Sequence, residues 1–327
     1  MEQQSDATIE RMDVCVLAGG ASAERDISLE SGAAVADALT SRGHRVSTVD
    51  PAETDIAQHD WSGTDAVFIA LHGTFGEDGQ VQHILEQARI PFTGSDSTAS
   101  QLAFSKSASK ERFAQRNVPT PAYVLIHESD DGTRIDRQAR KVGYPLIVKP
   151  DAQGSSFGVS LVEAADGLPR ALTGCFHYDT FGMLESAIAG SEWTVGFLDD
   201  LALPLIQIET GRTFFDFAAK YSDETTSYHF EFALPANVIR SIEQAARNAC
   251  EALGTRGLTR VDLRLDRHNR PWVLEVNTIP GLTSHSLVPK AAARMGIDLS
   301  ELCERTLVRC LSESAVRQSA LRPRHVR

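Results

Sequence analysis

Polar side chains stand at alternate positions in two apolar stretches of the last third of the chain. Arg260 and Asp262 lie in RVDLRLD, and Glu275 and Asn277 lie in VLEVN. The residues RHNR between the two stretches are typical of a turn, so we expect a β-hairpin. Because alternate residues share a face of a strand, the hairpin can bring the Asp262, Glu275 and Asn277 oxygen atoms to one point beside a guanidinium. Mg²⁺ prefers such ligands, although the pattern alone also fits a solvent-facing strand with scattered charges.

A lysine and a loop of small residues form a second candidate for ligand binding. Lys149 lies near the end of the apolar stretch PLIVKP, and Gly154, Ser155 and Ser156 follow shortly after it. Backbone N–H groups of such a loop can hold phosphate oxygens, and the lysine adds a point charge. The spacing differs from the GxxxxGK[ST] pattern of a Walker loop. Without further support, a flexible turn between two strands is the simpler interpretation.

The polar stretch KYSDETTSY is a third candidate. It opens with Lys220 and Tyr221. A loop of this kind can close over a ligand and exclude water from a reaction. As a lone stretch, it is better explained as an exposed loop.

Strands and a helical pattern alternate in the first part of the chain. DVCVLAGG, HRVSTVD and DAVFIALHG predict strands, and the apolar spacing from Ser28 to Ala38 predicts a helix. This order, continuing to about Gly94, predicts a small α/β domain with a parallel sheet. Function in such sheets gathers at the carboxyl ends of strands, which here carry AGGASAERDIS and LHGTFGEDG. A Rossmann dehydrogenase is excluded, because AGGASAER lacks the G-x-G-x-x-G pattern and no ribose-binding acid is identifiable.

The rest of the chain continues with strands and helices and has no internal repeat. We expect one helix from about Ser97 to Gln115, another from about Ala236 to Leu253, and helical structure from Leu287 to Ser312. The strands expected between these helices are GYPLIVKP, GMLESAIAG, SEWTVGFLD, LALPLIQIE, LTRVDLRLD and PWVLEVN. The alternation of both element types indicates a mixed α/β protein.

Length and composition agree with a multi-domain globular protein. A chain of 327 residues exceeds one ordinary core, so two or three subdomains are expected. We divide the chain into the segments 1–96, 97–186 and 187–327. The apolar fraction of 42% and charged fraction of 23% are typical of globular proteins, and no apolar run reaches the ~18 residues of a membrane span.

Charge, cysteines and the start of the chain limit the environment and the partners. The net charge of −12 argues against a general nucleic-acid binder, which needs a basic face. The polar, acidic start lacks the plan of a secretion signal, and the five cysteines are odd in number without CxxC spacing. We therefore expect reduced thiols and a cytoplasmic protein.

Taken together, the lysine strand, the glycine–serine loop and the carboxylate hairpin resemble the ATP-grasp superfamily. Six stretches are similar, in order, to the successive signatures of the D-alanine–D-alanine ligase family: GGASAERDIS, LHGTFGEDG, VKPDAQGSSFGVS, KYSDETTSY, RVDLRLD and LEVNTIPGLTSHSLVP. They cover roughly Val14 to Pro289. The resemblance implies a three-subdomain ATP-grasp fold with an N-terminal parallel-sheet α/β domain on the first-substrate side, followed by central and C-terminal ATP-grasp subdomains.

The resemblance also implies a reaction and its reactants. ATP would drive the joining of two D-alanines to D-alanyl-D-alanine through an acyl phosphate, for peptidoglycan precursor synthesis. The implied cofactor is Mg²⁺, as two ions with Mn²⁺ as an alternative, held by Asp262, Glu275 and Asn277. The implied partners are small molecules only, with neither nucleic acid nor membrane, and the family tends to form homodimers.

The family's catalytic and substrate positions map onto individual residues of this chain. Glu24 would bind the ammonium of the first D-alanine, with Ser155 and Tyr221 linked to it by hydrogen bonds. Arg260 and the Gly281 amide would stabilise the oxyanion. The remaining substrate positions are His72 near the first D-alanine, and Ser286 and the Leu287 amide at the carboxylate of the second. The nucleotide positions are Lys106, Ile147, Lys149, Glu185, Ser186, Ala187, Glu192, Lys220 and Leu274.

The chain departs from the family pattern at several places. Ser105 replaces the usual Asp, and Gln153 and Phe157 replace a Glu and a small aliphatic residue around the serine loop. Ser186 stands where many members have a lysine. The stretch YHFEFALPA is about four residues longer than usual, which puts the shape of the acceptor pocket in question.

Three functions therefore stay open at the level of sequence. The first is a housekeeping D-alanine–D-alanine ligase. The second is a relative that joins other D-amino acids, or D-alanine to a hydroxy acid, and Tyr221 argues against the hydroxy-acid form because those members tend to have His there. The third is a nucleotide-binding protein without catalysis. Phosphate release that depends on an added amino acid separates the third from the first two.

Overall fold

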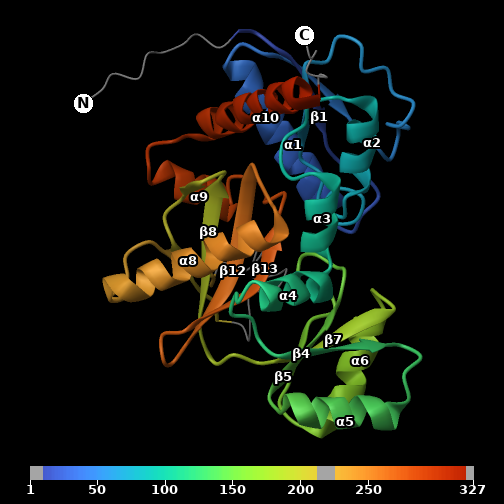
Figure 1. Ribbon diagram of the computed structural model, residues 1–327, viewed down its shortest axis with the longest axis vertical. Helices are drawn as coiled ribbons and strands as arrows, with labels where there is room; N and C mark the ends of the chain where they lie inside the picture. Colours follow the sequence, from blue (N-terminus) through green and yellow to red (C-terminus); the bar gives the residue numbers. More distant parts are fainter. Residues whose placement is uncertain (1–9, 212–224, 322–327) are drawn as a thin grey trace, which may run out of the picture.

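Three β-sheets follow one another along the length of the molecule in the computed structural model (Figure 1). The structure describes residues 10–211 and 225–321. A three-stranded sheet lies at the end drawn uppermost, a six-stranded sheet lies in the middle, and a four-stranded sheet lies at the opposite end. The expected mixed α/β fold class is confirmed. No helix in the described ranges has the length and apolar character needed to cross a membrane.

The first sheet is the predicted parallel sheet. Strands β1 (Asp13–Leu17), β2 (Arg45–Val49) and β3 (Ala66–Ile69) pair in the order β2-β1-β3, and both pairings are parallel. Helices α1 (Arg25–Ser41) and α2 (Gln80–Ala88) connect to these strands. Almost every residue of β1 and β3 is buried, as expected for parallel strands covered on both faces. The carboxyl ends of β1 and β3 therefore point in the same direction, toward the rest of the molecule.

The expected single helix from Ser97 to Gln115 is wrong. The chain forms α3 (Ser97–Phe104) and α4 (Lys106–Gln115), with Ser105 extended between them at φ −79° and ψ 112°. The Ser105 side chain accepts a hydrogen bond from the Ala108 amide, so it caps α4 and ends the helix before it. This break directs α4 back toward the middle of the molecule.

The second sheet lies within the predicted central segment. Its order is β4-β7-β5-β6, and all its pairings are antiparallel. Its strands are β4 (Tyr123–His127), β5 (Leu146–Pro150), β6 (Ser160–Val162) and β7 (Phe181–Ser186). The helices of this segment are α5 (Gly132–Val142), the short 3₁₀ turn η1 (Ala165–Gly167) and α6 (Leu168–Phe176). Helices α5 and α6 share one core with the sheet, which leaves its other face toward the middle of the molecule (Figure 1).

The third sheet contains the predicted hairpin. The path of the sheet is β11-β10-β8-β12-β13, with β9 paired to β8. Its strands are β8 (Gly190–Leu198), β9 (Leu201–Ala202), β10 (Ile206–Glu209), β11 (Ser227–His229), β12 (Leu258–Asp266) and β13 (Pro271–Asn277). The expected helix after Ala236 is confirmed as α8 (Ala236–Leu253). Its apolar face, with residues of α3 and α4, forms a core on one face of this sheet.

Two helices end the described chain, where one helical stretch was expected. They are α9 (Leu287–Ala293) and α10 (Leu299–Leu321), and the turn between them contains Gly296 at φ +78°. A positive φ of this size favours glycine and stops a helix. Helix α10 lies across α1 (Figure 1), and Leu302 and Leu307 share a core with Val14 and Leu39.

Each of the three predicted segments contains one of the three sheets. Two packing arrangements cross the predicted boundaries at residues 96 and 186. Helices α3 and α4 begin the central segment but pack in the core of the third sheet. Helix α10 belongs to the third segment but packs against the first.

Candidate active site

The hairpin β12–β13 brings the four predicted polar side chains to neighbouring positions. Asp262 lies directly opposite Glu275, and Arg260 lies directly opposite Asn277. Opposed residues of an antiparallel pair point to the same side of a sheet. The expectation that these residues share a face is therefore confirmed, and α8 covers the other face.

A β-bulge places two consecutive residues of β13 on that face. The register shifts after Asp262 and leaves Leu274 as an extra residue in β13. Val273 and Val276, on either side, are buried in the core beneath the sheet, whereas Leu274 and Glu275 both line a cavity above it. A bulge re-aims side chains in this way because two residues oppose one on the partner strand. One strand thus supplies an apolar wall and a carboxylate to the same cavity.

Arg260 and Asp262 form a two-pronged ion pair. Arg260 Nε and Nη2 donate to the two Asp262 carboxylate oxygens, both at 2.9 Å. The Thr194 hydroxyl also donates to Asp262, at 2.7 Å. A fork of two parallel hydrogen bonds fixes the plane of a guanidinium. The guanidinium is therefore held in one orientation at the edge of the site.

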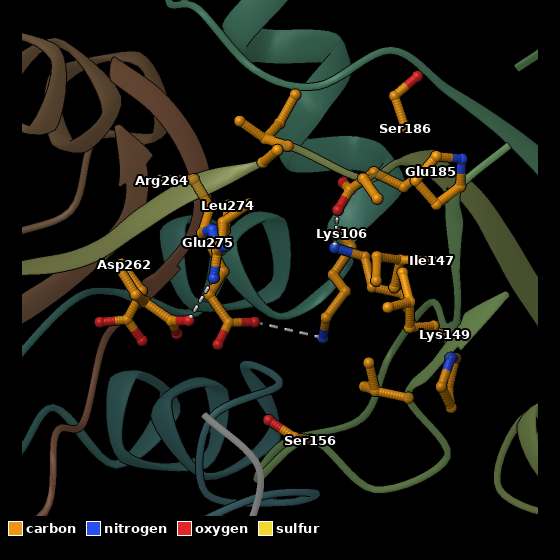
Figure 2. A pocket seen from close by; sticks show the side chains of 18 of the residues that line it. Lys106, Ile147, Lys149, Ser156, Glu185, Ser186, Asp262, Arg264, Leu274 and Glu275 are labelled. Atoms are coloured by element: carbon orange, nitrogen blue, oxygen red, sulfur yellow. Dashed lines mark hydrogen bonds and ion pairs between the residues drawn. The ribbon is translucent and has the colours of Figure 1, made fainter. Parts of the chain in front are cut away.

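A cavity of about 270 Å³ lies between the four-stranded and six-stranded sheets. Figure 2 shows residues of both sheets and of α4 facing each other across it. Its apolar walls come mainly from β5, the segment 187–189 and Leu274. Its lining includes every predicted nucleotide residue that the structure describes: Lys106, Ile147, Lys149, Glu185, Ser186, Ala187, Glu192 and Leu274. The predicted Lys220, and the predicted catalytic Tyr221, lie outside the described residues.

Two buried lysines flank Glu185 on the wall of this larger cavity. Lys149 Nζ lies 2.8 Å from Glu185 Oε1, and Lys110 Nζ lies 2.5 Å from Glu185 Oε2. Burial alone would raise the pKa of Glu185, but the two ammonium groups outweigh it, so this pKa lies below its ordinary value. Glu185 is therefore an ionised carboxylate in a nearly dry site.

Lys106 connects the two sheets at the floor of the cavity. Its Nζ donates to the Gln153 carbonyl at 2.7 Å and lies 3.6 Å from Glu275 Oε2 (Figure 2). The start of its helix is held by Asp151, which accepts hydrogen bonds from the Ser107 amide and the Ser105 hydroxyl. The Ser105 departure from the family pattern thus serves as a cap that also binds Asp151.

A second, smaller cavity of about 60 Å³ adjoins the first. Lys106, Gln153 and Glu275 line both cavities. The smaller one also contains the predicted substrate residue His72 and several predicted catalytic and metal-binding residues: Glu24, Ser155, Arg260, Asn277 and Gly281. A large, mainly apolar cavity therefore meets a small polar one across a wall that carries a lysine and a carboxylate.

The Glu24 carboxylate lies close to the backbone at two glycines, where a side chain would not fit. A Cβ atom on Gly73 would lie 2.7 Å from Glu24 Oε2, and one on Gly154 would lie 2.5 Å from the same oxygen. The Ser155 hydroxyl donates a hydrogen bond to Glu24 Oε1. Ser155 itself has φ +49°. The first segment and the glycine–serine loop (residues 153–158) therefore meet at this carboxylate.

His72 lines the same cavity as Glu24, and a second carboxylate, that of Glu77, lies near its ring. Its Nε2 is 3.0 Å from the Ser31 hydroxyl, and its Nδ1 is 3.9 Å from Glu77 Oε1. Burial raises the pKa of Glu77, and the charge of Glu24 acts in the same direction. Sequence reasoning missed Glu77, although it stands in the LHGTFGEDG stretch already singled out.

Of the two predicted acceptor residues, Ser286 lies next to Gly281, which lines the smaller cavity. A Cβ atom on Gly281 would lie 2.7 Å from the Ser286 hydroxyl oxygen, so Ser286 touches a lining residue. That oxygen accepts the Thr283 amide at 3.1 Å. Leu287 begins α9 and is buried. Neither Ser286 nor Leu287 is among the residues that line the two described cavities.

The longer stretch after Tyr228 packs away from both cavities. Lys290 of α9 lies over the ring of Tyr228, and Arg294, directly after α9, lies over the ring of Phe230, at 5.7 and 4.5 Å from the ring centres. Phe232 meets Trp193 edge-on at 4.8 Å. These aromatic residues support α9 and β8 from outside. None of them is among the described cavity-lining residues.

Two features of the larger cavity were not expected from the sequence. The Ala187 amide donates to the Pro145 carbonyl at 3.2 Å, so it is already used within the protein. Arg264 lines the cavity and pairs with Glu192 at 3.0 Å. Arg264 could have been found, because it follows Arg260 and Asp262 at the next alternate position of the same strand.

The donor set on the hairpin fits a hard cation. Asp262, Glu275 and Asn277 offer carboxylate and amide oxygens on one face, and Mg²⁺ is bound by such groups together with phosphate oxygens. No cluster of three or more His, Cys, Asp or Glu side chains suited to a metal occurs in residues 10–211 and 225–312.

Comparisons with known proteins agree with this arrangement. The family model for the D-ala D-ala ligase N-terminus matches residues 50–95, and that for the D-ala D-ala ligase C-terminus matches residues 113–308. A D-alanine--D-alanine ligase of Gloeobacter violaceus is 40% identical over 92% of this chain and 100% of its own length.

Solved structures give the same result. A D-alanine--D-alanine ligase from Bacillus anthracis, crystallised with ATP, has a TM-score of 0.82 at 30% identity and covers 94% of this chain and 99% of its own. The VanG D-Ala:D-Ser ligase of Enterococcus faecalis has a TM-score of 0.81 at 26% identity and covers 92% and 100%. Together with the family models, these matches show that the chain belongs to the D-alanine–D-alanine ligase family, with its ATP-grasp fold.

Proposed function

We propose that this protein joins two D-alanines to D-alanyl-D-alanine at the expense of ATP, supplying a precursor of peptidoglycan. One observation carries the proposal: the larger cavity and the smaller polar cavity share Lys106, Gln153 and Glu275. A nucleotide in the first would bring its terminal phosphate to the second. There Glu24 can hold the ammonium group of an amino acid.

The larger cavity suits a nucleoside triphosphate. Ile147 and Leu274 supply apolar walls of the kind that enclose a flat base, while Lys106 and Lys149 supply positive charge. Asp262, Glu275 and Asn277 would hold Mg²⁺, which when bound would neutralise charge on the phosphates and on the transferring group. The proposal includes two Mg²⁺ ions, and Lys220 as a further positive charge near the phosphates.

The first step is phosphoryl transfer to the first D-alanine. Its carboxylate oxygen attacks the γ-phosphorus, the bond to the β-phosphate oxygen breaks, and ADP and an acyl phosphate form. Such a transfer requires positioning and neutralisation of charge rather than covalent help. Glu24 would fix the ammonium end of the substrate, and Ser155 holds Glu24 in place. His72 and Tyr221 would complete this end of the site.

The second step forms the peptide bond. The amine of the second D-alanine attacks the acyl carbon, a proton leaves the nitrogen, and phosphate departs from the tetrahedral intermediate. Arg260 and the Gly281 amide would stabilise its oxyanion, and one such donor typically contributes ~2.7–4 kcal/mol. Ser286 and the Leu287 amide would hold the carboxylate of the second substrate.

Three broader expectations belong to the same proposal. They are residence in the cytoplasm, assembly as a homodimer, and a division of the chain near residues 96 and 186. Sedimentation at several concentrations would test the dimer directly.

The test is phosphate release from ATP and Mg²⁺ with D-alanine, L-alanine, D-serine and D-lactate, each alone and in pairs. Release with D-alanine alone, together with D-alanyl-D-alanine identified by mass, is the expected result. Release only with a mixed pair would move the function toward a relative such as the D-Ala:D-Ser ligase. ATP binding without release for any pair would point to a protein that has lost catalysis.

A further inference from the structure

Lys110 is a fully buried lysine immediately behind the larger cavity. Its side chain has 0% exposure. Its Nζ lies 2.5 Å from Glu185 Oε2, 2.6 Å from the Thr120 hydroxyl and 3.4 Å from the Pro121 carbonyl. The Tyr123 ring centre lies 5.6 Å away. Lys110 is not among the described lining residues of either cavity, so it has no direct route to a ligand there.

Glu185 stands between Lys110 and Lys149, and the two lysines differ in what they can reach. Lys149 lines the cavity, whereas Lys110 lies on the side away from it. A nucleotide phosphate would draw the Lys149 ammonium toward itself. Glu185, which is 2% exposed, would then lose one of its two counterions. A buried carboxylate without a partner is strongly destabilising, so the remaining lysine decides whether Lys149 can move.

Lys110 also connects the two walls of the cavity. The Thr120 hydroxyl that accepts from Lys110 donates to the Val273 carbonyl at 2.8 Å. Val273 directly precedes the bulged Leu274 in β13. Through Thr120, one ammonium group therefore links Glu185 on β7 to the strand that supplies the opposite apolar wall.

We propose that Lys110 is a positioning residue for the nucleotide: it keeps Glu185 charged and in place when Lys149 turns to the phosphates, and it sets the spacing of the two cavity walls. This inference rests on the proposed function, because it takes ATP as the ligand. Lys110 would act on nucleotide affinity while leaving the groups around Glu24 and Arg260 untouched.

The proton on Lys110 should also make ATP affinity depend on pH. Burial lowers the pKa of Lys110 to about 8, with the Lys149 charge acting in the same direction and Glu185 and Glu275 acting against it. The ring of Tyr123 is the other titratable group facing it. Because the pKa is lowered, the ammonium loses its proton as the pH rises through about 8. We therefore expect the Kd for ATP to rise between pH 7 and pH 9.

The experiment is ATP binding by calorimetry to wild type and to Lys110→Met, without amino acid, followed by D-alanine turnover at saturating ATP. We expect the Kd and the KM for ATP to rise about tenfold and kcat to change less than about threefold, with tenfold equal to about 1.4 kcal/mol. The rise in Kd between pH 7 and pH 9 should be absent in Lys110→Met. Wild-type affinity in Lys110→Met would overturn the inference.

Phe113→Leu is the matched control. Phe113 is fully buried on the same helix and belongs to the core of the third sheet. Its replacement should lower stability while leaving the Kd for ATP within about twofold of wild type. An equal loss of ATP affinity in this variant would show that any lesion in α4 suffices and would overturn the inference.

A milder variant covers the case in which Lys110→Met does not fold. Thr120→Val removes the hydroxyl between Lys110 and Val273 and keeps the shape of the side chain. It should weaken ATP binding to a smaller extent, about threefold, and unchanged affinity would count against the link between the walls. Wild type that binds ATP but forms no product would contradict the proposed function alone, because the binding comparison would still stand.

Discussion

The loop that presents Glu24 is anchored by one carboxylate, that of Asp50. Asp50 directly follows β2 and pairs with Arg25 at 2.7 Å. It also accepts the Gly20 amide at 2.9 Å, and a Cβ atom on Gly19 would lie 2.5 Å from it. The Asp50 oxygens are thus occupied by Arg25 and by the loop backbone, and these contacts fix the loop that carries Glu24.

Asp50→Asn should loosen that loop. Burial alone would raise the pKa of Asp50, but hydrogen bonds from Arg25 and the amides of Gly20 and Ala52 outweigh it and lower the pKa below 3.8. A lowered pKa means that the carboxylate contributes stability above its unfolded pKa and loses it as the pH falls. We expect a loss of ~1–3 kcal/mol in unfolding free energy at pH 7, measured by urea denaturation.

The same comparison at several pH values makes the prediction specific. The difference between wild type and Asp50→Asn should shrink as the pH falls through the folded pKa of Asp50. Asp37→Asn is the control, since Asp37 is an exposed carboxylate on α1. A pH-independent difference would mean that the ion pair with Arg25 is not its source.

Arg260→Ala should damage chemistry more than nucleotide binding. Arg260 is fixed by Asp262 at the edge of the smaller cavity, where the oxyanion would form. Loss of one oxyanion donor typically lowers kcat by ~10²–10³. We expect that fall with a Kd for ATP within a few-fold of wild type. Arg264→Ala, four residues along the same strand, should instead raise the KM for ATP. Similar behaviour of the two variants would contradict the oxyanion role.

At the scale of the element, an aromatic stack anchors the glycine–serine loop. Phe157, at a position where the family pattern has a small aliphatic residue, stacks on Tyr178 with ring centres 5.6 Å apart and planes at 27°. A Cβ atom on Gly158 would lie 2.9 Å from the Tyr178 ring. The loop that carries Ser155 therefore rests on the end of α6. This contact holds the loop against both cavities.

Tyr178→Ala should raise the KM for ATP roughly two- to tenfold, because an aromatic pair contributes ~0.5–1.5 kcal/mol beyond burial. Tyr178 is 43% exposed, so its loss should change the unfolding free energy little. Adding Phe157→Val should have little further effect if the two rings act as a pair. Phe181→Ala, which breaks an exposed pair with His127 elsewhere on the sheet, is the control; additive effects of the first two variants would argue against the stack.

Local sequence patterns predicted the helices and strands, but they did not predict the bulge and the helix break that interrupt them. The hairpin and the shared face of Asp262 and Glu275 followed from alternation, which depends only on neighbouring residues. The bulge at Leu274 could not be predicted, because it depends on the register with β12. The break at Ser105 depends on hydrogen bonds to Asp151, which is distant in sequence. Lys110 was missed for the same reason, since its partner Glu185 becomes its neighbour only in the folded chain.

At the scale of the whole molecule, α10 closes the core of the first segment. Leu302 and Leu307 pack with Val14 and Leu39, and Arg42 binds Glu304, which is 262 residues later in the chain. The first sheet and the third segment thus share one apolar core. The positions of Glu24 and Arg260 relative to each other depend on that core.

Leu307→Ala should destabilise the first segment and the site together. Leu307 has 0% exposure, and truncation of such a residue typically costs ~2–5 kcal/mol. We expect faster hydrogen exchange in β1 and a lower kcat at temperatures where the protein remains folded. Leu311→Ala, half-buried at the margin of the same core, should have a smaller effect on both. Unchanged exchange in β1 would show that the first sheet is stable without α10.

The packing of α10 on α1 has a consequence for the order of events during synthesis. Strands β1 to β3 leave the ribosome first, yet the core on their α1 face stays incomplete until α10 has been made, whereas the core on the other face does not include α10. Domains usually fold in the order of their synthesis. Here one core of the first segment must wait for the last helix described, so the apolar surface that α10 covers stays exposed to chaperones and proteases through most of translation.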